Sequence, residues 1–175
     1  SSLLEAPIVS DLRGMRFINL ADGRSLLVWG NGYQFFDTKI MTFGQPRVPV
    51  GISELRDRSQ LAETTQGNVF ALGGCTDTGK SSAPHCVSSR EAYQYSPDED
   101  KWSSAKALSL PRAGGTVWED EEGALWLVGG SDESGHEQQT AERWSPAEGS
   151  LATYDNLYGP AVVHFGKAAT VFSRA

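Results

Sequence analysis

A sequence pattern that returns after about 50 residues is the strongest constraint on the fold of this chain. The segments EAYQYSPDEDKWSSAKALSLP and TAERWSPAEGSLATYDNLYGP align at a constant offset of 49 residues. The alignment places Tyr95 opposite Trp144 and Pro97 opposite Pro146. Self-similarity at a fixed period of this length is typical of repeat architectures. The sequence therefore predicts several copies of one small structural unit.

Each copy contains a short apolar run bounded by glycine. The runs are GRSLLVWGN from Gly23, GNVFALGG from Gly67 and GALWLVGG from Gly123, with a weaker copy, GKAATVFSR, from Gly166. Short, nearly continuous apolar runs suit strands that are buried on both faces. Two runs end in the glycine doublets Gly73-Gly74 and Gly129-Gly130. These doublets permit positive φ and a close approach of neighbouring backbone.

Polar turns separate the apolar segments. Ser-Pro-Asp-Glu-Asp and Ser-Pro-Ala-Glu-Gly carry proline at the second position of a type I turn. They are expected to join a strand ending at Tyr95 or Trp144 to one beginning at Trp102 or Leu151. The segment EDEEG predicts a further tight turn. The chain is therefore expected to be all-β, with about four antiparallel strands in each repeat.

Four features together resemble the kelch repeat. They are VFALGG, an aromatic residue before Ser-Pro, a tryptophan seven residues after that aromatic residue, and LPRAGG. The resemblance is clearest from Gly67 to Gly130 and extends to Pro160; it is weaker in the first 45 residues and at the carboxyl end. It implies a β-propeller of four-stranded blades, with Trp102, Trp126 and Trp144 packed between blades. The structural repeat positions are Gly73, Gly74, Tyr95, Trp102, Gly129, Gly130 and Trp144.

Under this resemblance residues 1–175 form a single repeat domain. Blade 1 spans approximately residues 13–46, blade 2 residues 47–105, blade 3 residues 106–155, and a partial blade 4 residues 156–175. A closed kelch ring usually needs about six blades of roughly 50 residues, so a partial propeller is expected. Three explanations remain open: a fragment of a longer propeller, a ring completed by a partner chain, and a compact four-bladed propeller in which Leu3 to Val9 pairs with Val162 to Phe172.

One segment, ISELRDRSQLAETT at residues 52–65, is less regular. Ser53 is a possible N-cap for a short helix. We expect instead a loop that leads into a strand, because each repeat needs a connection at this point from its outer strand to the next inner strand.

Cys75 and Cys86 are the only cysteines, and they bracket the small and polar segment TDTGKSSAPH. Such a segment is typical of a loop, and a disulfide that closes it is expected to stabilise the fold by roughly 2–3 kcal/mol. The alternatives are two free thiols, or a zinc site that also uses His85 but lacks a fourth ligand. A disulfide favours an extracellular or other oxidising compartment, whereas free thiols suit the cytoplasm.

The long connections at one end of the expected meanders are the candidate binding surface, because loops on a rigid scaffold commonly carry function. The basic and polar residues proposed to contact a ligand there are Arg56, Arg58, Lys80, Ser82, His85, Arg90 and His136. Arg47 is expected to join Arg56 and Arg58 in a local basic group that binds a carboxylate or an acidic peptide. Ordinary solvated charge is the alternative explanation.

Composition and motifs argue against several functions. The formal net charge of −7 disfavours nucleic-acid partners, and no apolar run is long enough for membrane insertion. The three histidines, His85, His136 and His164, show no spacing that indicates a copper site, and the carboxylates gather in turns. No catalytic constellation is recognised, so we expect a non-enzyme without metal or cofactor.

The sequence therefore favours a protein–protein interaction module that presents loops on one face. Self-association, or a second chain that completes the propeller, is a further expectation for partners. The alternative is a carbohydrate-binding or carbohydrate-processing propeller, including a fragment of an enzyme similar to galactose oxidase. Aromatic side chains exposed on the loop face, such as Tyr33, Tyr154 or Tyr158, would favour this alternative by stacking on sugars.

Overall fold

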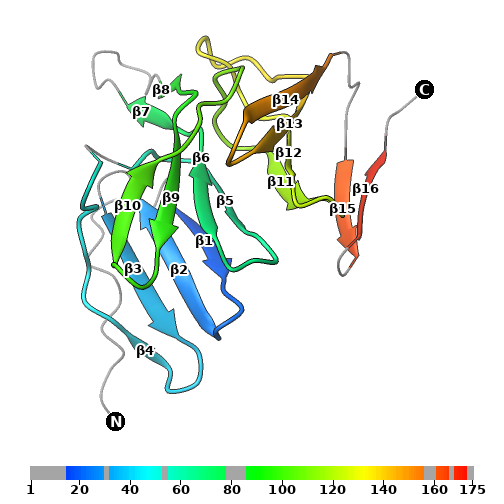
Figure 1. The fold of residues 1–175 in the computed structure, drawn as a ribbon. Helices are drawn as coiled ribbons and strands as arrows, with labels where there is room; N and C mark the ends of the chain where they lie inside the picture. The colour runs from blue at the N-terminus through cyan, green and yellow to red at the C-terminus, as the bar shows by residue number, and fades with distance from the viewer. Residues whose placement is uncertain are drawn as a thin grey trace.

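The structure of the chain is a computed structural model, and it contains only β-strands, turns and irregular segments where it is described (Figure 1). The described residues are 15–29, 32–52, 55–77, 86–155, 161–165 and 168–172. No helix occurs among them, so the prediction of an all-β fold is confirmed. Accordingly, no helix in these segments is long and apolar enough to cross a membrane.

Three four-stranded antiparallel sheets form most of the structure. The first contains β1 (Arg16–Asn19), β2 (Arg24–Trp29), β3 (Gly32–Asp37) and β4 (Thr42–Phe43). The second contains β5 (Gln60–Glu63), β6 (Val69–Leu72), β9 (Ala92–Ser96) and β10 (Lys101–Ser104). The third contains β11 (Thr116–Glu119), β12 (Leu125–Val128), β13 (Ala141–Ser145) and β14 (Gly149–Tyr154). Two hairpins complete the described strands: β7 (Cys75–Asp77) with β8 (Cys86–Ser88), and β15 (Ala161–Phe165) with β16 (Ala168–Phe172).

The order of strands within each sheet follows the predicted meander. Adjacent strands pair in sequence order in the first and third sheets, and the β7–β8 hairpin is inserted between β6 and β9 of the second. The 52–65 segment leads into strand β5, as expected. Strand β5 contacts both β1 and β11, so the first strands of the three sheets lie beside one another (Figure 1). No described sheet closes on itself, and Leu3 to Val9, the segment expected to close a small ring, lies outside the described residues.

Two apolar cores lie on opposite sides of the second sheet. Successive side chains of a strand point to opposite faces, so Val69 and Ala71 join the core shared with the first sheet. Phe70 and Leu72 join the core shared with the third sheet. Burial on both faces explains why the VFAL run is apolar at every position rather than at alternate ones.

Of the three tryptophans expected to pack between the sheets, two lie in these cores. Trp102 and Trp144 are both fully buried, and Trp102 packs against Tyr95 with ring centroids 5.2 Å apart. Trp126 does not follow the prediction of packing between the sheets. Its neighbours Leu125 and Leu127 face the second sheet, and strand alternation therefore turns the Trp126 ring to the other face of the third sheet.

The glycine doublets lie where loops of neighbouring sheets meet. Gly74 has φ +93°, and a Cβ atom there would lie 2.5 Å from Ser59 Oγ and 2.6 Å from Arg56 Cβ. Gly130 has φ +92°, and its Cβ would lie 2.7 Å from Gly114 O. Both positions therefore require glycine for the left-handed backbone and for close packing.

A buried ion pair lies next to these doublets. The Arg112 and Glu142 side chains are both inaccessible, with Nη2 and Oε2 3.8 Å apart. Arg112 Nη1 also donates to Gly129 O at 2.7 Å, and Ser109 N donates to Glu142 Oε1 at 2.7 Å. Desolvation lowers the pKa of Arg112, and the charge of Glu142 partly offsets this effect.

We predict that Glu142→Gln lowers the free energy of unfolding by about 3 kcal/mol, because it leaves a buried guanidinium without its counter-charge. The matched control is Glu148→Gln, at an exposed glutamate in the β13–β14 turn, which should change stability by less than about 0.5 kcal/mol. Urea unfolding followed by tryptophan fluorescence measures both. Equal stability of the two variants would contradict the structural role assigned to the pair.

Candidate functional site

The long connections of the three sheets meet at one end of the molecule, which we call the loop face. It comprises residues 44–59, 73–91, 105–115 and 129–140, of which 53–54 and 78–85 lie outside the described residues. Backbone contacts join these connections across the sheets, because Gly74 N donates to Arg112 O at 2.8 Å. Gly114 N similarly donates to Arg58 O at 2.8 Å.

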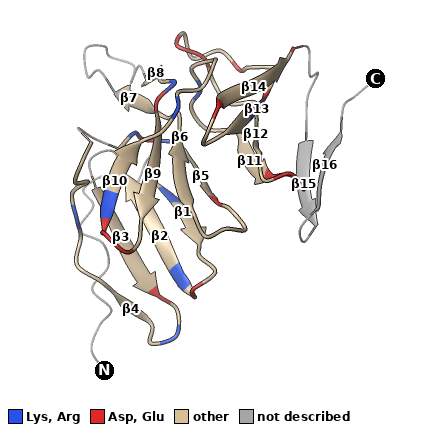
Figure 2. Ribbon diagram, viewed as in Figure 1, with Lys and Arg blue, Asp and Glu red and all other residues tan. Residues whose placement is uncertain are grey.

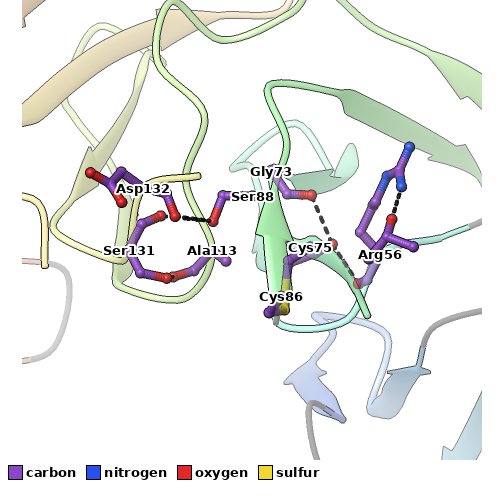
Figure 3. The surroundings of a disulfide bond; sticks show 10 residues. Arg56, Gly73, Cys75, Cys86, Ser88, Ala113, Ser131 and Asp132 are labelled. Atoms are coloured by element: carbon purple, nitrogen blue, oxygen red, sulfur yellow. Dashed lines mark hydrogen bonds between the residues drawn. A yellow bond between two sulfur atoms is a disulfide. The ribbon is translucent and has the colours of Figure 1, made fainter. Parts of the chain in front are cut away.

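The β7–β8 hairpin projects from this face and carries the predicted disulfide. Cys75 and Cys86 are bonded, with Cα atoms 5.3 Å apart (Figure 3). The segment between the cysteines was expected to be a loop, but its base is a β-hairpin in which Cys75 pairs with Ser88 and Asp77 with Cys86. Three of the predicted contact residues, Lys80, Ser82 and His85, lie outside the described residues.

The base of the hairpin is held on two sides. Cys75 N donates to Asp57 O at 2.8 Å, which ties the hairpin to the connection before β5. On the other side, Ser88 Oγ lies 2.9 Å from Ser131 O and 3.0 Å from Asp132 O, and donates to these carbonyls of the third sheet (Figure 3). Ser88 is itself buried. The disulfide hairpin is therefore a fixed part of the loop face.

A groove of about 550 Å³ runs beside the hairpin. Two of the predicted site residues, Arg56 and Arg90, line it. The rest of the lining is mostly polar and consists of Thr76, Val87, Ser88, Ser89, Glu91, Ala107 and Glu133. Arg90 is exposed, whereas Arg56 is half-buried. The groove thus offers one accessible cation above a floor of hydrogen-bonding groups.

Glu91 organises the floor of the groove. Its Oε2 accepts hydrogen bonds from Arg56 Nε at 2.8 Å and from Tyr93 Oη at 2.8 Å. Desolvation raises the pKa of Glu91, but hydrogen bonds from Arg56, Tyr93 and Ser89 outweigh it and leave the pKa lowered. Arg56 is therefore neutralised by a carboxylate, and its hydrogen bond to Thr76 Oγ1 fixes its position further.

The expected basic group of Arg47, Arg56 and Arg58 is not formed. Arg47 pairs with Asp100, which also accepts hydrogen bonds from Tyr95 Oη at 2.6 Å and Tyr33 Oη at 3.0 Å. Arg56 pairs with Glu91, as described above. Lys and Arg are spread over several segments rather than gathered in one patch (Figure 2).

Arg58 instead lies near an arginine from another sheet. A Cβ atom at Gly114 would be 3.4 Å from Arg58 Nη2 and 3.8 Å from Arg16 Nη2, so both guanidiniums approach the same glycine. The sequence analysis did not identify Arg16, because the two residues are distant in sequence and only the packing of β1 beside β5 brings them together.

His136, the remaining predicted contact residue, lies on the loop that joins β12 to β13. Its side chain is 81% exposed, with Nδ1 3.7 Å from Asp132 Oδ2. His136 N also donates to Asp132 Oδ1 at 2.9 Å, which closes a tight turn. His136 does not line the groove beside the disulfide hairpin.

A second pocket, of about 470 Å³, lies on the outer face of the third sheet. Trp126 stacks between Trp118 and Tyr154, with ring centroids 6.0 Å and 5.3 Å apart. Tyr154 is 47% exposed. The charged residues around the rings are Asp120, Glu121, Glu122 and Arg143. Of the tyrosines proposed for sugar stacking on the loop face, Tyr33 is buried and Tyr158 lies outside the described residues. Tyr154 is exposed, but on the outer face of the third sheet rather than on the loop face.

Asp120 is the most strongly held carboxylate of this pocket. Its Oδ2 accepts from Arg143 Nε at 2.7 Å and from Trp126 Nε1 at 2.9 Å. Desolvation raises the pKa of Asp120, but these bonds and those from the backbone of Glu122 and Ala124 lower it to about 2. The carboxylate is therefore ionised in the folded protein at every ordinary pH.

The lowered pKa of Asp120 predicts a pH dependence of stability. Its pKa falls from an ordinary value of 3.8 to about 2 on folding, so its contribution is present above the ordinary value and is lost as pH falls toward 2. We predict that Asp120→Asn makes the free energy of unfolding less dependent on pH across this interval. Urea titrations at several pH values measure the slope. An unchanged slope in the variant would contradict this role.

Among the described residues, no group of three or more histidine, cysteine or acidic side chains is arranged to hold a metal ion.

The sequence matches no protein-family model and no curated protein. Solved structures with a similar fold are numerous, and 124 chains match. One of them, YjhT, matches with a TM-score of 0.67 and 14% sequence identity over 94% of this chain. The chain spans 58% of the length of YjhT. At this identity the likeness shows that the two chains share a fold.

Proposed function

We propose that the chain forms part of a kelch-type β-propeller and acts as a protein-interaction module through its loop face. The repeated four-stranded meanders, with their first strands side by side, support the propeller. The tie between Ser88 and the third sheet is the observation that carries the functional proposal, because it holds the disulfide hairpin rigidly beside the groove. A hairpin base fixed in this way loses little conformational entropy when a partner binds to it.

The charge distribution of the groove suggests how a partner would bind. Arg56 is committed to Glu91, whereas the Arg90 side chain is exposed on the rim and has no hydrogen bond or ion pair within the described residues. A partner with an acidic side chain would form an ion pair with Arg90. Backbone or hydroxyl groups of the same partner would form hydrogen bonds with Ser89 and Thr76. The oxidising environment that a disulfide requires makes an extracellular or similar compartment the proposed location.

Charge reversal on the loop face tests this proposal. We predict that Arg90→Glu abolishes partner binding, because it replaces attraction to an acidic group with repulsion. The matched control is Lys39→Glu, which makes the same charge change at an exposed turn on the opposite end of the sheets. Affinity capture from the extracellular fluid of the source organism, with quantitative mass spectrometry, compares wild type and both variants.

A protein enriched by the wild type and Lys39→Glu but lost with Arg90→Glu would support the loop face. A set of captured proteins that Arg90→Glu leaves unchanged, or the absence of any specific capture, would count against it.

A carbohydrate-binding function is the second candidate, and the Trp126–Tyr154 stack favours it. Partly exposed aromatic rings beside ionised side chains suit a sugar, which presents apolar C–H groups to the ring and hydroxyls to Asp120 or Arg143. This pocket lies on a sheet face rather than on the loop face, so the two candidate functions use separate surfaces.

A glycan array distinguishes this candidate from the first. If the ring of Tyr154 stacks on a sugar, Tyr154→Ala should remove binding and Tyr154→Phe should retain it. Selective binding by the wild type with this pattern would establish a sugar site. No selective binding by the wild type would contradict the carbohydrate function and leave the loop-face test unaffected.

A further inference from the structure

Two arginines from different sheets face each other at the inner edge of the loop face. Arg16 is the first residue of β1, and Arg58 lies two residues before β5 of the second sheet. Both guanidiniums approach Gly114, which belongs to the connection before β11. The first strand of the first sheet and the connections that lead into the first strands of the other two sheets therefore meet at this point, where these strands lie side by side.

The backbone at this point is fixed by the second sheet. Gly114 N donates to Arg58 O at 2.8 Å, and Gln60 Nε2 donates to Gly114 O at 2.6 Å. Gly114 is buried, but the adjacent Gly115 is exposed, and both arginine side chains are partly accessible. The site is thus preorganised and open to solvent.

The two arginines lie together as a pair of like charges. Within the described part of the chain, no carboxylate forms an ion pair with Arg16 or Arg58. Among the described residues, the Arg16 guanidinium donates a single hydrogen bond, to the neighbouring Met15 O at 3.3 Å. Burial lowers the pKa of Arg16, and the nearby charge of Arg58 lowers it further.

The backbone conformation of Arg58 carries a cost of its own. Its φ of +58° places it in the left-handed region, which glycine or asparagine adopts more readily than arginine. Such costs tend to persist at functional sites, where the side chain is needed for another reason.

We propose that Arg16 and Arg58 together bind an oxyanion, the carboxylate or phosphate group of a ligand, at the inner edge of the loop face. Guanidinium groups donate paired hydrogen bonds to such groups, and an anion between them replaces their mutual repulsion with two attractions. The inference does not depend on the proposed protein partner, because it rests on a different pair of side chains from those in the groove.

Nuclear magnetic resonance titration of the intact chain tests the site with two probes, sodium phosphate and sodium acetate. Sodium chloride at equal ionic strength is the reference for both. We expect a saturable shift of the Gly115 amide and of the Arg58 Nε–H signal with at least one probe. Arg16→Gln and Arg58→Gln should each weaken binding at least about tenfold, because each removes a charged donor.

The matched control is Lys39→Gln, which removes an exposed cation at the opposite end of the sheets, outside both proposed sites, and should leave the titration unchanged. Retained or increased thermal stability of Arg58→Gln would show that this variant is folded, and is expected because one of two repelling charges is removed. Saturation by phosphate alone assigns a phosphoryl ligand, and saturation by acetate assigns a carboxylate. No saturable shift beyond chloride, or equal weakening by Lys39→Gln, would overturn the proposal.

Discussion

Backbone hydrogen bonds between neighbouring sheets are the interaction on which the arrangement of this molecule depends. Sheets packed only through apolar side chains would be free to slide by small amounts, because apolar contacts have no directional preference. The bonds from Gly74 N to Arg112 O and from Gly114 N to Arg58 O are directional and fix one sheet relative to the next. Both bonds need a close approach of two loops, which the glycine doublets and the adjacent Gly114-Gly115 allow.

The buried Arg112 side chain reinforces the same junction. The backbone oxygen of Arg112 accepts a hydrogen bond from Gly74 N, which follows β6 of the second sheet. The Arg112 guanidinium donates hydrogen bonds to Gly129 O and Thr140 Oγ1, which lie between β12 and β13 of the third sheet. The groove, the disulfide hairpin and Arg58 of the arginine pair lie on connections that meet at this junction. Their geometry therefore follows from how the sheets are joined, and a ligand would meet positions that are set before it binds.

Much of the fold was predictable because its determinants are local. The apolar runs predicted strands β2, β6 and β12, and the Ser-Pro turns predicted the β9–β10 and β13–β14 hairpins. Phe36 and Phe43 have the same separation as Tyr95 and Trp102, and both pairs lie opposite each other on neighbouring strands. The disulfide was also predictable, since its cysteines bracket one short segment. The kelch resemblance and the closure of a ring stay predictions.

The candidate sites were less predictable, because their partners are distant in sequence. Arg56 meets Glu91 and Arg47 meets Asp100 only after two sheets have packed, so three arginines that are close in sequence have three different environments. The face on which Trp126 lies depends on strand register, which the apolar LWLV run does not reveal.

Amide hydrogen exchange of Gly74 and Gly114 tests most directly whether the sheets are joined as described. Both amides lie in connections rather than in strands, so without the inter-sheet bonds they would exchange as loop amides do. We predict that the Gly74 and Gly114 amides are protected from exchange to an extent comparable to those of Phe70 and Leu72 in the central strand β6. Rapid exchange of Gly74 and Gly114 alongside protected β6 amides would contradict it.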